Sequence, residues 1–428
     1  MARSSSIIGS RKGVLFIDGV NTISLAKKYG TPLLLTSERR LISNYERLES
    51  AFRKRYRNFR IRYAVKSNPN PSIIAIIAKS GGGADVASVG EIDIALMAGV
   101  SRDRITFSPN NVSADEFRYA IDRHIPVNFD DIGQYELALR YANPDLVSFR
   151  LNPGFGKGEF HGIITAGPQA KFGIPEAYIM KCYALAKKSG VKRFGIHAMG
   201  GSNVLTPEYF AAITSKVTEV AGRIAGTIGI EFEFIDIGGG FGVPYRKGEH
   251  DLDIERTARL VVGKFRERCD TFGLGNPTLM VEPGRYLVAD TTILLGTVNN
   301  VKQYSKTFIG TDIGMNVLIR PALYNAHHEI LVANRMGRPN SGKATVVGQI
   351  CENTDAIARD RSLPSISAGD TLAVLNAGAY VYSMSNQYNS IPRPMELLIT
   401  KTGKEVVIRR RETKKDVLST VVSHKRVS

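Results

Sequence analysis

Residues 62–69 read Arg-Tyr-Ala-Val-Lys-Ser-Asn-Pro. The apolar run at 63–65 ends at Lys66, and Pro69 follows three residues later. Short runs of this kind are typical of buried strands. A lysine at the end of such a strand is expected to be partly desolvated, which disfavours the ammonium form and lowers its pKa. A neutral amine condenses with a carbonyl, so Lys66 is a candidate Schiff-base lysine. The alternative is a structural lysine whose charged end reaches water.

Similar apolar runs recur from about residue 37 to residue 285, separated by amphipathic stretches of helical period. Helix signals agree with this alternation, because Ser88 and Ser113 begin capping-box patterns and Gly81 and Gly99 stand where helices end. Eight helical segments, the first at 37–53, alternate with eight predicted strands, which predicts a TIM-type (β/α)8 barrel over residues 37–285. The predicted strands are 61–65, 84–87, 104–108, 126–130, 146–151, 194–199, 232–237 and 279–282.

The pattern changes after Glu282 to runs rich in Val, Ile, Leu and Thr, separated by Gly, Pro and Asn. This pattern predicts a mostly antiparallel β domain over residues 286–428. The apolar run at 13–18, within residues 1–36, is expected to add a strand to that domain.

Composition excludes several classes of protein. The 428 residues are 43% hydrophobic, which is ordinary for a globular chain with a sizeable core and excludes disordered and fibrous classes. No run is long enough to cross a bilayer and residues 1–6 lack the apolar stretch of a secretory signal, so we expect a cytoplasmic protein with no membrane partner. The three cysteines lack the spacing of a metal site or a disulfide framework.

The formal charge of +17 would on its own allow a nucleic-acid partner. The basic residues gather mainly at 39–62 and in the tail from Arg409 to Arg426, however, while the intervening segments are typical of an enzyme core. We therefore predict no nucleic-acid partner.

In a (β/α)8 barrel the active site lies at the carboxyl ends of the strands. The triple glycine after the seventh strand would let backbone N–H groups approach a phosphate closely, and Ser202 would add a hydroxyl donor. A tight turn without a ligand is the alternative for these glycines. Unusually polar or glycine-rich segments occupy this end of the predicted barrel: Lys66, Asp85, Arg150, His197, Gly238–Gly240 and Glu282–Arg285.

A Schiff-base lysine beside a phosphate site indicates pyridoxal 5'-phosphate (PLP). Glu282 would then keep the pyridine nitrogen protonated, which makes the ring a stronger electron sink. His197 and Met199 point to the same side of their strand, and either is placed to lie against the ring. A hydrogen-bonded core histidine is the alternative for His197.

Ordered motifs over most of the chain resemble the fold-type III PLP-dependent decarboxylases. The segment from Gly314 to Tyr324, Gly-Met-Asn-Val-Leu-Ile-Arg-Pro-Ala-Leu-Tyr, is similar to the signature of the diaminopimelate decarboxylase branch. The motifs that carry the resemblance are 63–68, His197 with Gly201-Ser202, 238–240, 282–285, 351–355 and 378–380.

The resemblance implies that Lys66 holds PLP, that Glu282 faces the pyridine nitrogen, and that Asp85 and Arg150 lie near the other face of the cofactor. It also implies a head-to-tail homodimer in which the partner subunit contributes Cys351 as the proton donor and Glu352 as a substrate-binding carboxylate. It implies further that Gly240, Ser202 and Tyr380 bind the phosphate. The other candidate cofactor contacts are Met199, Gly238, Gly239, Gly284 and Arg285.

Two features depart from the family pattern. Met199 stands where the second, ring-stacking histidine of the family usually falls, and the tail beyond about Arg409 matches nothing in the family. The first departure leaves open which of His197 and Met199 lies against the ring.

The charged residues also favour one substrate, an amino acid with a zwitterionic far end. Arg285 and Arg320, with Tyr324 nearby, are suited to a distal carboxylate, and Glu352 to a distal ammonium. Tyr380 is a further candidate substrate contact. This predicts decarboxylation of meso-2,6-diaminopimelate to L-lysine and CO2, with the stretch 157–173 as a specificity element. Structural ion pairs are the alternative for the two arginines.

The sequence leaves other functions open. They are a decarboxylase of ornithine, arginine, D-lysine or carboxynorspermidine, and a non-enzymatic homologue, which would be expected to have lost Lys66 or Cys351. A racemase is disfavoured because Glu282, and not an arginine, is available to the pyridine nitrogen.

Overall fold

The computed structural model describes residues 7–160, 162 and 165–422. The chain divides into two units, each described by itself. The barrel unit comprises Leu41–Pro244 and Gly248–Val288, and the β unit comprises the residues up to Arg40, Tyr245–Lys247 and the residues from Ala289. The N-terminal residues 1–6 and the predicted specificity residue His161 lie outside the described residues, as do Lys425 and Arg426 of the basic tail.

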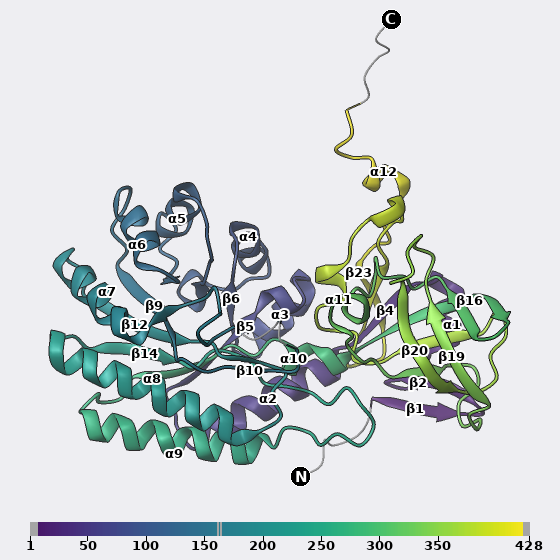
Figure 1. Ribbon diagram of the computed structural model, residues 1–428, viewed down its shortest axis with the longest axis horizontal. Coiled ribbons are helices and arrows are strands. Elements are labelled where there is room, and N and C mark those ends of the chain that lie inside the picture. The colour runs from purple at the N-terminus through teal and green to yellow at the C-terminus, as the bar shows by residue number, and fades with distance from the viewer. Residues whose placement is uncertain (1–6, 161, 163–164, 423–428) are drawn as a thin grey trace, which may run out of the picture. The chain divides into compact units, whose positions relative to one another are not determined.

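The barrel unit is built on a closed ring of parallel strands (Figure 1). Each strand pairs with the next, and the last, β15, pairs with the first, β5. The two-residue strand β11 (Ile174–Pro175) adds to β9 outside the ring. The ring strands are β5 (Phe59–Ala64), β6 (Gly83–Val86), β7 (Ile105–Phe107), β8 (Val127–Phe129), β9 (Leu146–Asn152), β12 (Arg193–Ala198), β14 (Phe232–Asp236) and β15 (Thr278–Val281). All eight predicted strands are present, which confirms the (β/α)8 fold.

The helices alternate with these strands as predicted. Ser88 accepts a hydrogen bond from the Glu91 N–H at 3.2 Å, and Ser113 forms a capping box with Glu116. No helix of the described residues is long and apolar enough to cross a membrane. The helices are α2 (Glu38–Arg53), α3 (Pro71–Lys79), α4 (Val89–Met97), α5 (Ala114–Ile121), α6 (Ile132–Leu139), α7 (Glu176–Lys188), α8 (Pro207–Ile228) and α9 (Ile254–Phe272).

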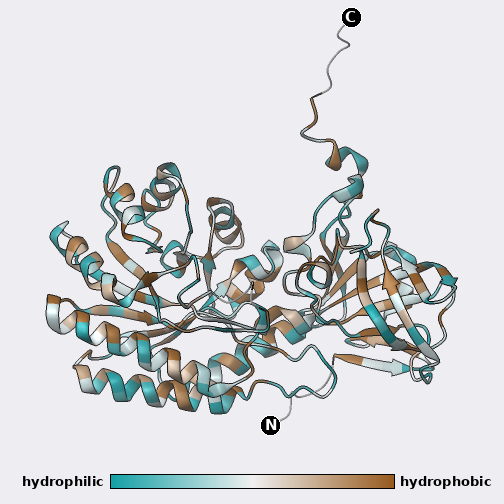
Figure 2. Cartoon of the chain, viewed as in Figure 1, coloured by the Kyte–Doolittle hydropathy of each residue, from teal (hydrophilic) through white to brown (hydrophobic). Residues whose placement is uncertain are grey.

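The barrel core lies between the strands and the helices that surround them. α8 and α9 lie side by side along one flank, and each alternates apolar and polar residues (Figures 1 and 2). Aromatic side chains join strands to helices: the rings of Phe129 and Tyr135 lie 5.1 Å apart, and those of Phe149 and Tyr183 lie 5.0 Å apart. This packing holds the strand ends, and therefore the residues that follow them, in fixed positions.

The β unit contains a sheet of mixed strand direction around the long strand β16 (Thr292–Gln303). β4 (Leu33–Ser37) lies in its centre, antiparallel to β16 and parallel to β22 (Met395–Ile399). The other strands are β17 (Thr307–Thr311), β18 (Ile330–Val332), β19 (Gly342–Val347), β20 (Ala356–Leu363), β21 (Thr371–Val374) and β23 (Glu405–Arg409).

The N-terminal contribution to this sheet differs from the prediction. The run at 13–18 does form a strand, β2 (Val14–Ile17), but it belongs to a separate three-stranded sheet with β1 (Ile8–Arg11) and β3 (Val20–Asn21). The strand that enters the large sheet is β4, after the short helix α1 (Thr22–Tyr29). β4 is buried along its whole length, so its continuous leucine run suits a central position better than the half-exposed β2 does.

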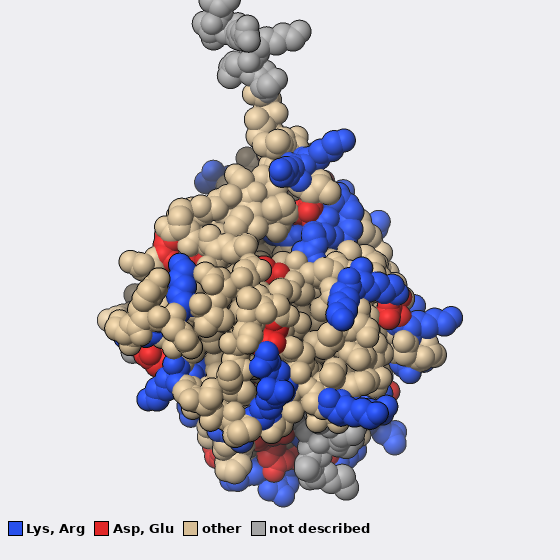
Figure 3. Space-filling model, turned by 90° about the vertical axis from the view of Figure 1, so that its right-hand side faces the viewer, with Lys and Arg blue, Asp and Glu red and all other residues tan. Residues whose placement is uncertain are grey.

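The basic tail beyond Arg409 has a structural use within the β unit. Arg411 donates to the Pro32 carbonyl at 2.9 Å, Arg393 pairs with Glu412, and Arg409 donates to the buried Glu396 at 2.6 Å. Figure 3 shows one face of the molecule, on which lysines and arginines form separate groups with uncharged surface between them. On that face the charge therefore does not form the continuous stripe that a nucleic-acid backbone would follow.

Gly195 in β12 offers a test of barrel packing. A Cβ there would lie 2.1 Å from the ring of Phe234 on the neighbouring strand, so Gly195→Ala forces buried groups apart. We expect a loss of about 1–3 kcal/mol in the free energy of unfolding, measured with guanidinium. Gly226→Ala in α8 is the control, since a Cβ there meets nothing within 4 Å and alanine should stabilise by up to about 1 kcal/mol. Equal stability of the two variants would contradict this packing.

Candidate functional site

Lys66 follows the first barrel strand, in a 3-10 turn formed by Val65–Ser67. Its Nζ lies 3.7 Å from Oδ2 of Asp85, a buried residue of β6. The lysine side chain is 48% exposed, however, so the expected desolvation of Lys66 is wrong for this structure. The reason is local: β5 ends at Ala64, and the tight turn releases the side chain from the strand before Lys66 is reached.

A buried carboxyl group faces Lys66 from the second strand. Burial, and then the charge of Glu282, raise the pKa of Asp85 to about 6, although Lys66 and His197 oppose the shift. The proton on Asp85 is therefore weakly held near neutral pH, beside the amine that is the candidate Schiff-base former.

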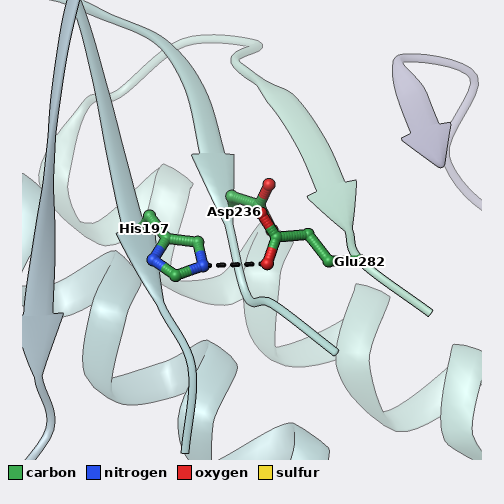
Figure 4. Close-up of side chains that lie close together, drawn as sticks. All are labelled: His197, Asp236 and Glu282. Carbon is green, nitrogen blue, oxygen red and sulfur yellow. Dashed lines mark hydrogen bonds and ion pairs between the residues drawn. The ribbon is translucent and has the colours of Figure 1, made fainter. Parts of the chain in front are cut away.

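His197, Asp236 and Glu282 meet at the ends of three consecutive ring strands (Figure 4). Nε2 of His197 lies 3.0 Å from Oε2 of Glu282, and all three side chains are buried. The second carboxylate oxygen, Oε1 of Glu282, has no hydrogen-bond partner within the described part of the chain. Glu282 therefore has one oxygen fixed by His197 and one available.

The two carboxyl groups of this cluster have opposite tendencies. Burial and the nearby Glu282 raise the pKa of Asp236 well above its usual value. Burial also acts to raise the pKa of Glu282, but the favourable charges of His197, Lys66 and Arg150 outweigh it and lower that pKa. Glu282 is thus the ionised member of the pair, and Asp236 is the protonated one.

The glycine turn lies directly beside this cluster. Gly238 and Gly240 have φ of 70° and 92°, in the left-handed region that favours glycine. A Cβ on Gly239 would lie 2.4 Å from the carbonyl oxygen of Glu282, and one on Gly240 would lie 2.9 Å from that of Gly201. The three glycines are therefore needed for close backbone approach, whatever they bind.

Met199 takes part in this turn. Its sulfur accepts a hydrogen bond from the N–H of Gly239 at 3.1 Å, while Thr165 donates to its carbonyl oxygen at 3.2 Å. The residue that departs from the family pattern thus contacts the glycine turn, while His197 contacts Glu282.

Ser202, Gly284 and Arg285 complete one side of the barrel end. Arg285 donates to Ser202 Oγ at 3.3 Å, and a Cβ on Gly284 would lie 3.0 Å from the Ser67 hydroxyl. Gly284 therefore allows the segment after β15 to pack against the turn that carries Lys66.

Arg150 in β9 connects the barrel end to the predicted specificity stretch. Its guanidinium lies 3.5 Å from Asp130 and stacks on the ring of Phe172, with 4.5 Å between the guanidinium carbon and the ring centroid. Asp130 also accepts the N–H of Gly173 at 3.1 Å, so this arginine–aspartate pair anchors the end of that stretch. Burial lowers the pKa of Arg150, although Asp130 opposes the shift.

Arg320 lies in the β unit, at the start of α11 (Arg320–Tyr324), and is only 2% exposed. Its Nη1 lies 2.7 Å from Nε2 of His328, and its guanidinium stacks on Tyr245 at 4.7 Å. Nδ1 of His328 lies 2.8 Å from the Leu375 carbonyl, which requires a donor there and leaves Nε2 as an acceptor for the arginine. His328 is therefore a neutral hydrogen-bond acceptor for Arg320.

Cys351 and Glu352 lie in an exposed loop of the β unit. Asp355 holds that loop to the 314–324 segment, because it accepts the N–H groups of Met315 at 2.6 Å and Ile350 at 2.7 Å. Tyr380, in the same unit, has a left-handed backbone with φ of 59°. Asp355 thus explains physically why the 351–355 motif and the 314–324 motif occur together.

The predicted site residues therefore fall into two groups. Those of the barrel unit are brought together at the carboxyl ends of the strands: Lys66, Asp85, Arg150, His197, Met199, Ser202, Gly238, Gly239, Gly240, Glu282, Gly284 and Arg285. Those of the β unit are Arg320, Tyr324, Cys351, Glu352 and Tyr380.

Sequence reasoning missed Asp236 and His328. A carboxylate within the apolar strand before Gly238 was a usable signal for Asp236, since a buried charge requires a partner. His328 is one of two adjacent histidines after α11, and nothing in the sequence alone connects it to Arg320.

The chain matches the family model of the pyridoxal-dependent decarboxylase, pyridoxal binding domain, over residues 41–289. It belongs to the pyridoxal-dependent decarboxylases. Two relatives, the diaminopimelate decarboxylases of Methanothermobacter thermautotrophicus and Thermoplasma acidophilum, are 44% and 45% identical to it, each over 95% of this chain and over 95% and 96% of their own lengths.

Solved structures agree with this assignment. The crystal structure of diaminopimelate decarboxylase from M. jannaschii in co-complex with L-lysine superimposes with a TM-score of 0.89 at 32% identity. The match covers 97% of this chain and 98% of that one. Membership of the family makes PLP the cofactor of this chain.

The barrel end fits such a cofactor. Glu282 offers a buried, ionised oxygen to a protonated ring nitrogen, and the glycine turn offers backbone N–H groups. His197, Asp236 and Glu282 also present donor atoms within 4.8 Å of one another, which is compatible with a metal ion.

The raised pKa of Asp85 makes a prediction about stability in cofactor-free protein. The unfolded chain releases this proton near pH 4 and the folded chain near pH 6, so wild-type protein should lose stability as the pH rises between these values. This loss in the free energy of unfolding amounts to up to roughly 3 kcal/mol between pH 4 and pH 7. Asp85→Asn has no such proton and should not show it. Guanidinium unfolding at both pH values measures it.

The exposed Asp270→Asn is the control and should show no such dependence. The raised pKa would be contradicted if wild type and Asp85→Asn differed in free energy of unfolding by the same amount at pH 4 and pH 7.

Proposed function

We propose that this chain decarboxylates meso-2,6-diaminopimelate to L-lysine and CO2. The observation that carries the proposal is the 44–45% identity over 95% of the chain to relatives named diaminopimelate decarboxylase. The co-complex of the M. jannaschii relative with L-lysine supports the same assignment, since lysine is the product of this reaction.

The proposed cofactor contacts follow from the barrel geometry. Lys66 would hold the cofactor through its amine, and the turn at Gly238–Gly240 with Ser202 and Tyr380 would bind the phosphate. Glu282, fixed by His197, would hold the proton on the ring nitrogen through its available oxygen. Bound PLP supplies an electron sink for the pair released when the carboxylate leaves as CO2.

The N–H of Gly239 already donates to the sulfur of Met199. We therefore propose that this N–H supports the turn, while the neighbouring N–H groups of the turn contact the phosphate. His197 would then act chiefly by orienting Glu282. Asp85 and Arg150 would line the opposite face, with Asp85 close to the amine of Lys66.

The proposed substrate contacts explain the preference for a zwitterionic far end. Arg285 and Arg320 with Tyr324 would bind the distal carboxylate, and Glu352 the distal ammonium. The buried position of Arg320 supports this role, because its contacts with His328 and Tyr245 hold the guanidinium in one orientation. Orientation by these groups selects which carboxylate is lost.

We propose that Cys351 donates the proton that replaces the lost carboxylate. In a head-to-tail homodimer the Cys351–Glu352 pair of one subunit would serve the barrel of the other. The exposed position of both residues in the chain supports a partner at this loop.

The substrate proposal is tested with PLP-loaded protein offered meso-diaminopimelate, ornithine, lysine and arginine in parallel. We expect CO2 and L-lysine from diaminopimelate alone, and no turnover by Lys66→Ala, because the cofactor then has no amine to hold it. Amino-acid analysis and CO2 release are the measurements. Turnover of ornithine, lysine or arginine in place of diaminopimelate would refute the substrate while leaving the decarboxylase chemistry intact.

Shared sites are tested by mixing two inactive variants, Lys66→Ala and Cys351→Ala. Random exchange of subunits makes half of the dimers mixed, and each mixed dimer has one intact site of two, so about a quarter of wild-type activity should return. As the control, each variant is taken through the same subunit exchange on its own, and no activity should return. No recovery, despite exchange shown by differently tagged subunits, would mean that each site is built from one chain.

A further inference from the structure

The short segment 386–390 contacts both members of the Cys351–Glu352 pair. Tyr388 donates its hydroxyl proton to Oε1 of Glu352, and Asn389 donates from Nδ2 to the sulfur of Cys351 at 2.9 Å. Thr354 binds the other oxygen of Glu352 at 3.0 Å. Two adjacent residues of the 386–390 segment therefore hydrogen-bond to two adjacent residues of the Cys351 loop.

The backbone of this segment has an uncommon conformation that produces the match. Asn389 and Ser390 have φ of 56° and 57°, in the left-handed region where asparagine is tolerated and most other residues are strained. The segment is anchored from both sides: the N–H of Asn386 donates to the Asn316 carbonyl at 2.9 Å, and Gln387 donates to Glu412 at 2.9 Å. These contacts hold the strained turn against the Cys351 loop.

The chemistry of the Asn389 contact gives the thiol a direction. An amide NH2 only donates, so the sulfur accepts through a lone pair and its own proton is directed away from Asn389. A carboxylate at the same position would accept that proton and turn it inward. With the NH2 of Asn389 turned toward the sulfur, the S–H of Cys351 is available to another group.

The Tyr388 contact acts on the charge of Glu352. Hydrogen bonds from Tyr388, and then from Thr354, lower the pKa of Glu352, so an ionised carboxylate is held in one orientation although it is exposed. An oriented anion is what a substrate ammonium requires.

We propose that Asn389 and Tyr388 are positioning residues of the decarboxylase, Asn389 by directing the thiol proton of Cys351 toward the reacting carbon and Tyr388 by orienting Glu352 toward the distal ammonium. This inference rests on the proposed function, which gives Cys351 and Glu352 their roles. Neither Asn389 nor Tyr388 needs to touch the substrate for it to hold.

The Asn389 part is tested on PLP-loaded enzyme with Asn389→Ala and the isosteric Asn389→Asp. We expect kcat to fall roughly 10- to 100-fold with little change in KM, more for Asp than for Ala, because proton delivery is impaired and substrate binding is not. The solvent deuterium isotope effect on kcat should rise in both variants. A merely structural asparagine would not raise it.

A double-mutant cycle sharpens this test. Once Cys351→Ser has removed the thiol, adding Asn389→Ala should cause little further loss, because the two residues act as one unit. The Asn389 assignment would be overturned if the loss of kcat in the double variant equalled the product of the losses in the two single variants. Wild-type kinetics in both Asn389→Ala and Asn389→Asp would also overturn it.

The Tyr388 part predicts the opposite kinetic pattern. Tyr388→Phe should raise KM for diaminopimelate roughly 10-fold with kcat nearly unchanged, since one charge-assisted hydrogen bond to Glu352 is lost. The analogue α-aminopimelate lacks the distal ammonium, so its KM should be the same in wild type and variant. An equal rise in KM for both compounds would overturn the Tyr388 assignment.

Ser390→Gly is the matched control, because glycine keeps the left-handed backbone without strain and the contacts to Cys351 and Glu352 come from Asn389 and Tyr388. We expect wild-type kinetics from it. Cofactor content and thermal unfolding show that each variant is folded. Failure of the proposed function appears separately, as a wild-type enzyme that makes no lysine from diaminopimelate. The Asn389 cycle is then measured on the amino acid that the enzyme does decarboxylate, since proton delivery is common to all of them.

Discussion

The barrel end depends on one electrostatic constraint, the burial of Asp85, Asp236 and Glu282 close together. Like charges in a dry site cannot all persist, so the protons must be divided among the three groups. His197, hydrogen-bonded to Glu282 at 3.0 Å, decides the division by favouring the ionised form of that residue. Asp236 and Asp85 then hold their protons more tightly than usual. Glu282 then carries its charge with one available oxygen, which is what a protonated pyridine nitrogen needs.

The glycine turn makes this arrangement possible. Gly239 approaches the Glu282 backbone so closely that any side chain would displace it, and the Met199 sulfur fills the adjacent space while accepting the Gly239 N–H. The turn that we propose for the phosphate and the carboxylate that we propose for the ring nitrogen are therefore coupled through direct backbone contact. A substitution in one should disturb the other, even where the substituted residue touches no ligand.

The fold followed from the sequence because alternation of short apolar runs and amphipathic helices is a local signal, repeated eight times. The site residues at strand ends followed for the same reason, since parallel strands bring their carboxyl ends together. Three features did not follow. The exposure of Lys66 depends on a 3-10 turn, the central place of Leu33–Ser37 depends on pairing across hundreds of residues, and the contact of His328 with Arg320 depends on the packing of α11. The first is a local turn that the apolar pattern did not signal, and the other two depend on contacts between segments distant in the sequence.

The β unit shows how an exposed loop can still present reactive groups in fixed orientations. Asp355 binds two backbone N–H groups on separate segments, Thr354 and Tyr388 hold Glu352, and Asn389 holds the sulfur of Cys351. These contacts use one lone pair of the sulfur and one on each carboxylate oxygen, so the thiol proton and the second lone pair of each oxygen are left for other groups. The loop is thus organised before any partner or substrate arrives, so binding need not supply the energy to order it. Preorganisation of this kind would let substrate contacts be used for orientation at the reacting carbon.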